Sequence, residues 1–225
     1  MVIDPKIRKI YSQIQKQLFY IIPEKWNKVY LYSSILDRQS NLKTGELYFY
    51  YVPNGILKKN PVNVYEIPNK FSINEDIYLK LVDKIYSEIK KLQKVFNENG
   101  EEKWKGIVIS IADFKFEVEY FYDDLGNSKF NSYEKHLIFR HIYLGYPITS
   151  FNKNERNVID RYLNEVRYNK PKKKVYSEVM YEMPFETIEI GRKNSNIQYV
   201  KEDDERLLLI EDKKEFKSQI LKSGF

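Results

Sequence analysis

The chain has 225 residues, 42% of them hydrophobic and 16% aromatic, and its 38 basic and 32 acidic residues give a net charge of +6. This composition excludes a disordered chain and fits one large folded domain, or one domain with an appendage. The absence of cysteine excludes disulfides and thiolate catalysis, and the absence of a signal peptide and of any run of roughly 18 apolar residues predicts a cytoplasmic protein that does not enter a membrane.

The first part of the chain predicts a helix followed by strands. Asp4-Pro5 supplies an N-cap and a proline at the first helical position, and an apolar face at helical spacing continues to Ile21. The next segments alternate apolar and polar side chains or carry runs of aromatic residues. We expect strands over residues 29–36 and 47–52, and a short one within residues 62–67, which two prolines limit.

The centre of the chain predicts a long helix followed by a β-hairpin. A capping box at residues 72–75 begins the helix. Residues 107–111 and 114–122 then alternate apolar and polar side chains, so each is expected to be a strand with one buried face. Because only Ala112 and Asp113 separate them, they are expected to form a tight antiparallel hairpin.

Two further helices follow the hairpin. Asn131 and Glu134 form another capping box, which begins a helix that Gly145 and Pro147 end. Asn152 begins the next helix. The residues predicted to point inward from this last helix are Val158, Ile159, Tyr162, Leu163 and Val166.

The basic stretch Lys170–Lys174 is predicted to be a linker between a body, residues 1–168, and a β-rich extension, residues 171–225. About fifty residues are marginally stable alone, so the extension is expected to dock on the body. Its predicted elements are strands over residues 185–190, 197–200 and 207–210 and a short helix from Asp212.

The order of these elements predicts an α+β fold. We expect a mainly antiparallel sheet that contains hairpins at about residues 29–52 and 107–122 and is packed by four helices, with the β-rich extension at the C-terminus. No internal repeat is visible in the sequence.

No pattern of residues indicates an enzyme. His136 and His141, the only histidines, are five residues apart and would point in different directions from one helix. Asp113, Glu117 and Glu119 are spaced like the carboxylates of some metal-dependent nucleases, but the lysine expected shortly after them is missing. The sequence also lacks a glycine-rich phosphate loop. We therefore assign no catalytic residue, no metal site and no cofactor.

Four segments, in their order and spacing, resemble the YezG/EsaG-like immunity proteins. They are residues 10–14 (IYSQI), 21–36 (IIPEKWNKVYLYSSIL), 45–51 (GELYFYY) and 121–145 (FYDDLGNSKFNSYEKHLIFRHIYLG). The resemblance covers residues 5–168 and implies a non-catalytic antitoxin, whose partner is the nuclease domain of a toxin that leaves its producer by the type VII secretion route. The chain departs from the family in two places: the segment after Lys170 is longer, and Phe139 stands where the family usually has tryptophan.

An acidic segment is the predicted toxin-contact surface. Residues 113–134 hold six acidic and two basic residues within a chain of net charge +6. Because a nuclease needs a basic groove to hold phosphate, carboxylates of an inhibitor can occupy that groove. The predicted contact residues are Glu117, Glu119, Phe121, Asp123, Asp124, Tyr133 and Glu134.

Three alternatives to this interpretation are open. The acidic residues can form an ordinary solvated sheet face. The basic first helix and Lys170–Lys174 can instead bind nucleic acid directly, which we do not favour. The chain can also be an adaptor that binds a protein without inhibiting it. Loss of a nuclease's activity at one-to-one stoichiometry, without binding of DNA by the chain itself, would favour the antitoxin.

Overall fold

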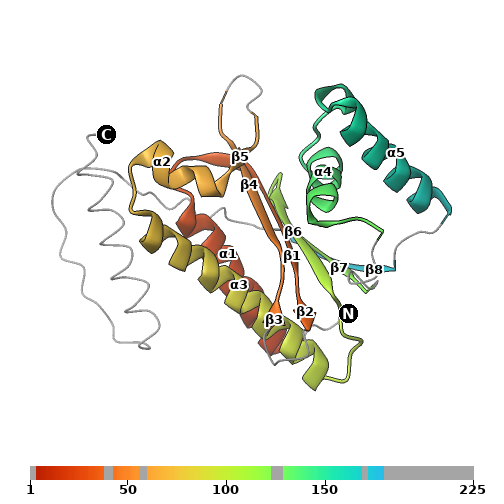
Figure 1. Cartoon of the computed structure of the whole chain (residues 1–225). Coiled ribbons are helices and arrows are strands. Elements are labelled where there is room, and N and C mark those ends of the chain that lie inside the picture. Colours follow the sequence, from red (N-terminus) through yellow and green to blue (C-terminus); the bar gives the residue numbers. More distant parts are fainter. Residues whose placement is uncertain (1–3, 38–42, 56–59, 123–128, 169–171, 180–225) are drawn as a thin grey trace.

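Six strands form one antiparallel sheet in the order β5-β4-β1-β6-β7-β8 (Figure 1). The computed structural model describes residues 4–37, 43–55, 60–122, 129–168 and 172–179. The predicted α+β class and its mainly antiparallel sheet are confirmed. The strands of the sheet are β1 (Trp26–Ser34), β4 (Leu47–Pro53), β5 (Val62–Asn63), β6 (Gly106–Ala112), β7 (Lys115–Phe121) and β8 (Lys173–Val179), and a separate ladder joins β2 (Leu36–Asp37) to β3 (Lys43–Thr44).

Helices cover both faces of the sheet (Figure 1). Two long helices, α1 (Pro5–Ile21) and α3 (Glu75–Glu98), pack against each other on one side, with the short helix α2 (Ile67–Phe71) before α3. The other side carries α4 (Ser132–Ile142) and α5 (Lys153–Tyr168), which also pack together. The four long helices agree with the prediction. Within the described residues, no helix is both long and apolar enough to cross a bilayer.

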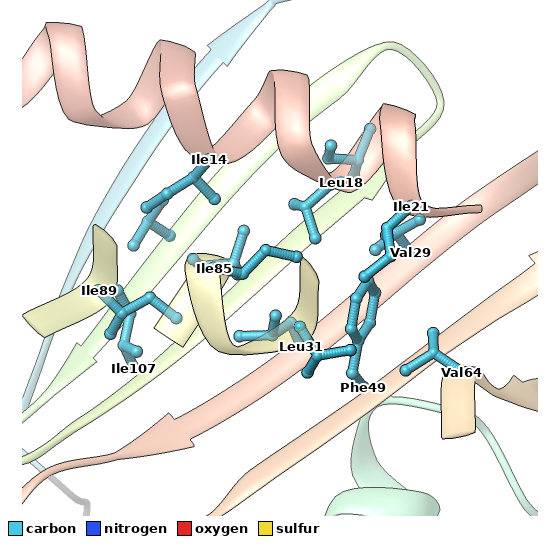
Figure 2. Close-up of a cluster of buried hydrophobic side chains, with 14 of the residues drawn as sticks. Ile14, Leu18, Ile21, Val29, Leu31, Phe49, Val64, Ile85, Ile89 and Ile107 are labelled. Atoms are coloured by element: carbon cyan, nitrogen blue, oxygen red, sulfur yellow. The ribbon is translucent and has the colours of Figure 1, made fainter. Parts of the chain in front are cut away.

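The main core lies between the sheet and the pair α1–α3. Figure 2 shows side chains from both helices pointing toward apolar side chains of the strands. Because the apolar stripe of each helix faces the same side of the sheet, these side chains are fully buried, and each contributes about 1.5–3 kcal/mol relative to an exposed position. At the centre of this core are Ile14, Leu18, Val29, Leu31, Phe49, Ile85, Ile89 and Ile107, each 0% exposed.

The third predicted strand is mostly wrong. Only Val62 and Asn63 pair with β4, and a 3-10 turn, η1 (Val64–Glu66), follows at once and leads into α2. The side chain of Asn63 accepts a hydrogen bond from the backbone N–H of Tyr65, and Pro68 lies in the first turn of α2. An asparagine cap and a proline near a helix start favour helical turns over a strand.

Two local boundaries differ from the sequence prediction. The hairpin between β6 and β7 turns through Asp113-Phe114, both with positive φ (51° and 58°), rather than through Ala112-Asp113. This is the combination that two-residue type I′ hairpins use, and it leaves Phe114 59% exposed. Likewise α3 is capped by Asn74, because Ser72 has a left-handed conformation and ends α2. The capping box at Asn131 and Glu134 is confirmed.

The last described elements also correct the prediction. Of the five residues expected to point inward from α5, only Ile159 is buried, and Leu163 is 41% exposed. Lys173 and Lys174 are the first residues of β8, which pairs with β7, so they are not part of a linker. The strands predicted over residues 185–190, 197–200 and 207–210 and the helix from Asp212 lie outside the described residues, and the division into two domains stays a prediction.

Candidate functional site

The side of the sheet away from α1 and α3 is the part of the molecule on which the predicted site residues gather. We call it the outer sheet face. Because side chains alternate along a strand, this face receives every second residue of β1, β4 and β7. It holds Tyr30, Tyr32, Tyr48, Tyr50, Glu117, Glu119 and Phe121.

Helix α4 is held on the outer sheet face by aromatic packing. Phe139 is 3% exposed, and its ring centroid lies 6.2 Å from Tyr32, 5.8 Å from Tyr48 and 6.2 Å from Tyr50. His136 stacks on Tyr48 at 4.6 Å between centroids. Such ring pairs add about 0.5–1.5 kcal/mol each beyond the area they bury. The aromatic run of β4 therefore serves both sides of the sheet. Tyr48 and Tyr50 pack against α4 on the outer sheet face, whereas Phe49 and Tyr51 belong to the main core.

Polar contacts position the first turn of α4. The Tyr48 hydroxyl donates to the backbone carbonyl of Ser132 at 2.8 Å, and the Ser132 hydroxyl donates to Glu46. Within the capping box, the Asn131 side chain accepts from the backbone N–H of Glu134 at 3.0 Å and Glu134 accepts from that of Asn131 at 2.9 Å. These bonds satisfy backbone groups that a helix start leaves without partners.

The predicted acidic residues of β7 are paired within the chain. Glu117 forms an ion pair with Lys115. Glu119 accepts from the ammonium group of Lys173 at 2.8 Å and from the hydroxyl of Tyr143 at 3.3 Å, and its side chain is only 13% exposed. Each carboxylate therefore offers an external partner less negative charge than the sequence count indicates.

The second predicted group lies at the start of α4 and is tied to α5. Glu134 accepts from Arg161 at 2.5 Å, and the hydrogen bond from the Asn131 backbone and the Arg161 guanidinium lower the pKa of Glu134. Tyr133 is 59% exposed, and its hydroxyl donates to Glu155 at 2.6 Å. The structure thus brings Glu117, Glu119 and Phe121 together on β7, and Tyr133 and Glu134 together on α4. Asp123 and Asp124 lie outside the described residues.

Basic residues near β8 bear on the nucleic-acid alternative. Lys172 pairs with Glu102 at 2.5 Å, Lys173 with Glu119 at 2.8 Å and Lys174 with Glu101 at 2.8 Å. A phosphate would have to compete with a carboxylate for each of these lysines. This part of the predicted basic surface is therefore less available to nucleic acid than its sequence suggests.

The two histidines serve different contacts. His136 Nε2 lies 2.7 Å from the Tyr50 hydroxyl, whereas His141 Nδ1 lies 2.8 Å from the backbone carbonyl of Tyr146. Across the described ranges, no group of three or more His, Cys, Asp or Glu side chains is arranged to hold a metal ion.

A groove on the same side of the molecule was not predicted from the sequence. It has a volume of about 860 Å³ and lies between β1, the end of β4 and the segment after α4. Gly145, with φ +69°, turns the chain at the end of α4 and allows Tyr146 and Pro147 to line the groove. The helix-ending Gly145 and Pro147 were visible in the sequence, but nothing there indicated that β1 would be the opposite wall.

The burial of His136 predicts a pH-dependent stability. Burial lowers the pKa of His136 from its ordinary value of 6.5, and the charge of nearby Arg140 lowers it further. The unfolded chain takes up the proton at the ordinary value, so below that pH the unfolded state binds more protons and stability falls as pH falls. His136→Gln should lose less stability than wild type between about pH 7.5 and pH 5.5 in urea unfolding. Because the carboxylates titrate equally in both proteins, parallel pH profiles would contradict this role.

Comparison with known proteins identifies relatives that match this chain over nearly all of their own length. The sequence profile of the family described as "Immunity protein YezG-like" matches residues 7–158. The immunity protein YezG of Bacillus spizizenii is 28% identical over 160 residues, 71% of this chain and 94% of that protein. The type VII secretion system protein EsaG of Staphylococcus aureus is 26% identical over 169 residues, 74% of this chain and 99% of that protein. The immunity protein YezG of Bacillus subtilis is 24% identical over 160 residues, which are 70% of this chain and 99% of that protein.

Proposed function

The chain belongs to the YezG-like family of immunity proteins, and from this premise we propose that it neutralises a nuclease toxin by binding it in a stoichiometric, non-catalytic complex. The observation that carries the proposal is the extent of the family match, residues 7–158, which runs from α1 into α5 and includes the whole outer sheet face except β8. An immunity role implies a toxin partner, and the family assignment supports an inhibitor in place of an enzyme.

We place the toxin on the side of the sheet that carries α4 and α5. The contact residues proposed there are Glu117, Glu119, Phe121, Tyr133 and Glu134, together with Asp123 and Asp124 outside the described residues. Among the described contact residues, Tyr133 is expected to contribute most to binding, because an exposed aromatic ring buries a large area when a partner covers it. The paired carboxylates are expected to steer association more than to supply affinity.

The name of one relative supports a proposal about the export route of the toxin and the place where this chain acts. Because a relative is a type VII secretion system protein, we propose that the toxin is exported by that route and that this chain protects the cytoplasm of the producing cell. Co-expression with the cognate nuclease toxin, to be sought among the genes beside this one, should allow growth, and the two proteins should co-purify in equal amounts. Death of cells that contain abundant folded chain would contradict the proposal.

Tyr133→Ala tests the contact surface. This variant should weaken binding of the inactivated nuclease about tenfold or more in calorimetry, since it removes an exposed ring from the proposed interface. Stability should change little, because Tyr133 contributes one surface hydrogen bond, to Glu155. Tyr65→Ala, which removes a ring 40% exposed in the turn before α2 and outside the proposed contact residues, is the matched control. Unchanged affinity of Tyr133→Ala would remove the start of α4 from the interface.

A further inference from the structure

The groove beside the end of α4 has features of a binding site for an extended polypeptide segment. Its volume of about 860 Å³ lies within the range of about 300–1,000 Å³ typical of ligand sites. Three tyrosines from two walls face it: Tyr30 from β1, and Tyr143 and Tyr146 from the segment that follows α4. Pro53 and Pro61 form part of the wall near β4 and β5. Rigid tyrosine and proline side chains lose little conformational entropy when a partner binds.

The walls of the groove are fixed by contacts within the chain. The backbone N–H of Tyr146 donates to the carbonyl of Arg140 at 3.2 Å, and the Arg140 guanidinium lies 4.6 Å from the centre of the Tyr146 ring. Tyr143 packs against Phe139 at 5.3 Å between centroids and donates to Glu119. The groove is therefore bounded by the segment that follows α4, the helix that packs on the outer sheet face.

The charge of the groove indicates its partner. Among the described residues that line it, Lys28 is the only charged one and none is acidic. Lys28 lies 3.9 Å from Asp113, a carboxylate 86% exposed, while the Lys28 side chain itself is 41% exposed. Such an exposed, distant pair is weak and easily exchanged for a better one. A partner carboxylate on Lys28 would have to displace Asp113, but it would meet no acidic residue among the described residues that line the groove.

We propose that this groove binds a short extended segment of the toxin polypeptide, with a carboxylate of that segment on Lys28 and its apolar side chains against Tyr30 and Tyr146. The inference rests on the proposed antitoxin function and adds to it the place and the chemistry of recognition. It differs from the contact predicted for the acidic segment, in which carboxylates of this chain take the place of phosphates in the nuclease groove. In the groove beside α4, the toxin supplies the acidic group and this chain supplies the cation. Because the described lining offers a single lysine, a single-stranded nucleic acid is disfavoured there and is kept as an outcome of the test.

Two variants test the groove with the full chain and the inactivated nuclease domain of the toxin identified by co-expression. Lys28→Glu should weaken the complex on the order of 100-fold, because it places a carboxylate opposite a carboxylate. Asn60→Trp, at an exposed lining position, should weaken it on the order of tenfold or more by filling the groove.

The matched controls lie on α3, on the opposite side of the sheet. Lys94→Glu changes a lysine that pairs with Glu98 at 3.7 Å, and Asn97→Trp adds a ring at an exposed asparagine. Both controls should stay within about twofold of wild type.

A charge swap identifies the partner residue. Each Asp or Glu of the nuclease that cross-links to the groove should be changed to lysine and tested against Lys28→Glu. One such change should restore at least about tenfold of the lost affinity, as expected for a direct pair. No rescue by any cross-linked residue would overturn the assignment of a carboxylate to Lys28.

The outcomes separate this inference from the proposed function. If wild type neutralises the nuclease and both groove variants bind as tightly as wild type while remaining folded, the function stands and the groove inference is wrong. If wild type does not bind the nuclease, both are wrong. Salt-sensitive binding of a labelled oligothymidine that Tyr30→Ala abolishes would assign the groove to nucleic acid and overturn the peptide assignment.

Discussion

Gly45→Ala is expected to destabilise the fold by about 3 kcal/mol or more, or to prevent soluble expression. A methyl group on Gly45 would lie 1.7 Å from the carbonyl oxygen of Ser34 and 2.5 Å from the Tyr86 hydroxyl. The Ser34 backbone cannot easily retreat, since its N–H donates to the Glu46 carbonyl at 3.0 Å and its hydroxyl accepts from the Glu46 N–H at 2.9 Å. Urea unfolding followed by circular dichroism measures the loss.

Gly100→Ala is the matched control for Gly45. Gly100 has φ +71° and no atom within 4 Å of an added methyl group, so the control carries backbone strain without a collision. Its cost should be about 1–2 kcal/mol. Equal losses in the two variants would show that the close approach of Gly45 to Ser34 does not limit stability.

Phe139→Ala is expected to release α4 from the outer sheet face while the main core stays folded. The substitution removes a ring that is 3% exposed and touches Tyr32, Tyr48 and Tyr50. Replacing a buried phenylalanine by alanine typically costs about 3–5 kcal/mol. Hydrogen exchange should show faster exchange over residues 132–142, and little change in α1 and α3, whose contacts lie on the other side of the sheet.

The same variant should lower toxin affinity on the order of 100-fold, because α4 carries Tyr133 and leads into Tyr143 of the groove. Phe139→Leu keeps most of the buried volume and should retain most of the affinity and the exchange protection. Unchanged protection of residues 132–142 in Phe139→Ala would mean that polar contacts such as Tyr48 to Ser132 hold α4 without the ring.

That Glu117, Glu119 and Glu134 contact a toxin stays a prediction, but the structure shows that their free negative charge is smaller than the sequence indicates. Alternation in β7 placed Glu117 and Glu119 on one face, as the structure shows. Their net charge could not be inferred, because Lys173 lies 54 residues from Glu119 along the chain and Arg161 lies 27 residues from Glu134. The groove was missed for a similar reason, since its walls come from separate segments that carry no shared motif.

By itself, the sequence determined most of the helices and strands and the buried side of α1, α3 and β7, because burial of an apolar face at a regular period is a local property of the chain. Ile14, Leu18, Ile85 and Leu31 lie where their spacing placed them. Only the tertiary structure decided which carboxylates are neutralised and where a partner segment can lie. Ion pairs and grooves depend on the distances between residues remote in sequence, and those distances are set when α4 and β8 pack on the sheet.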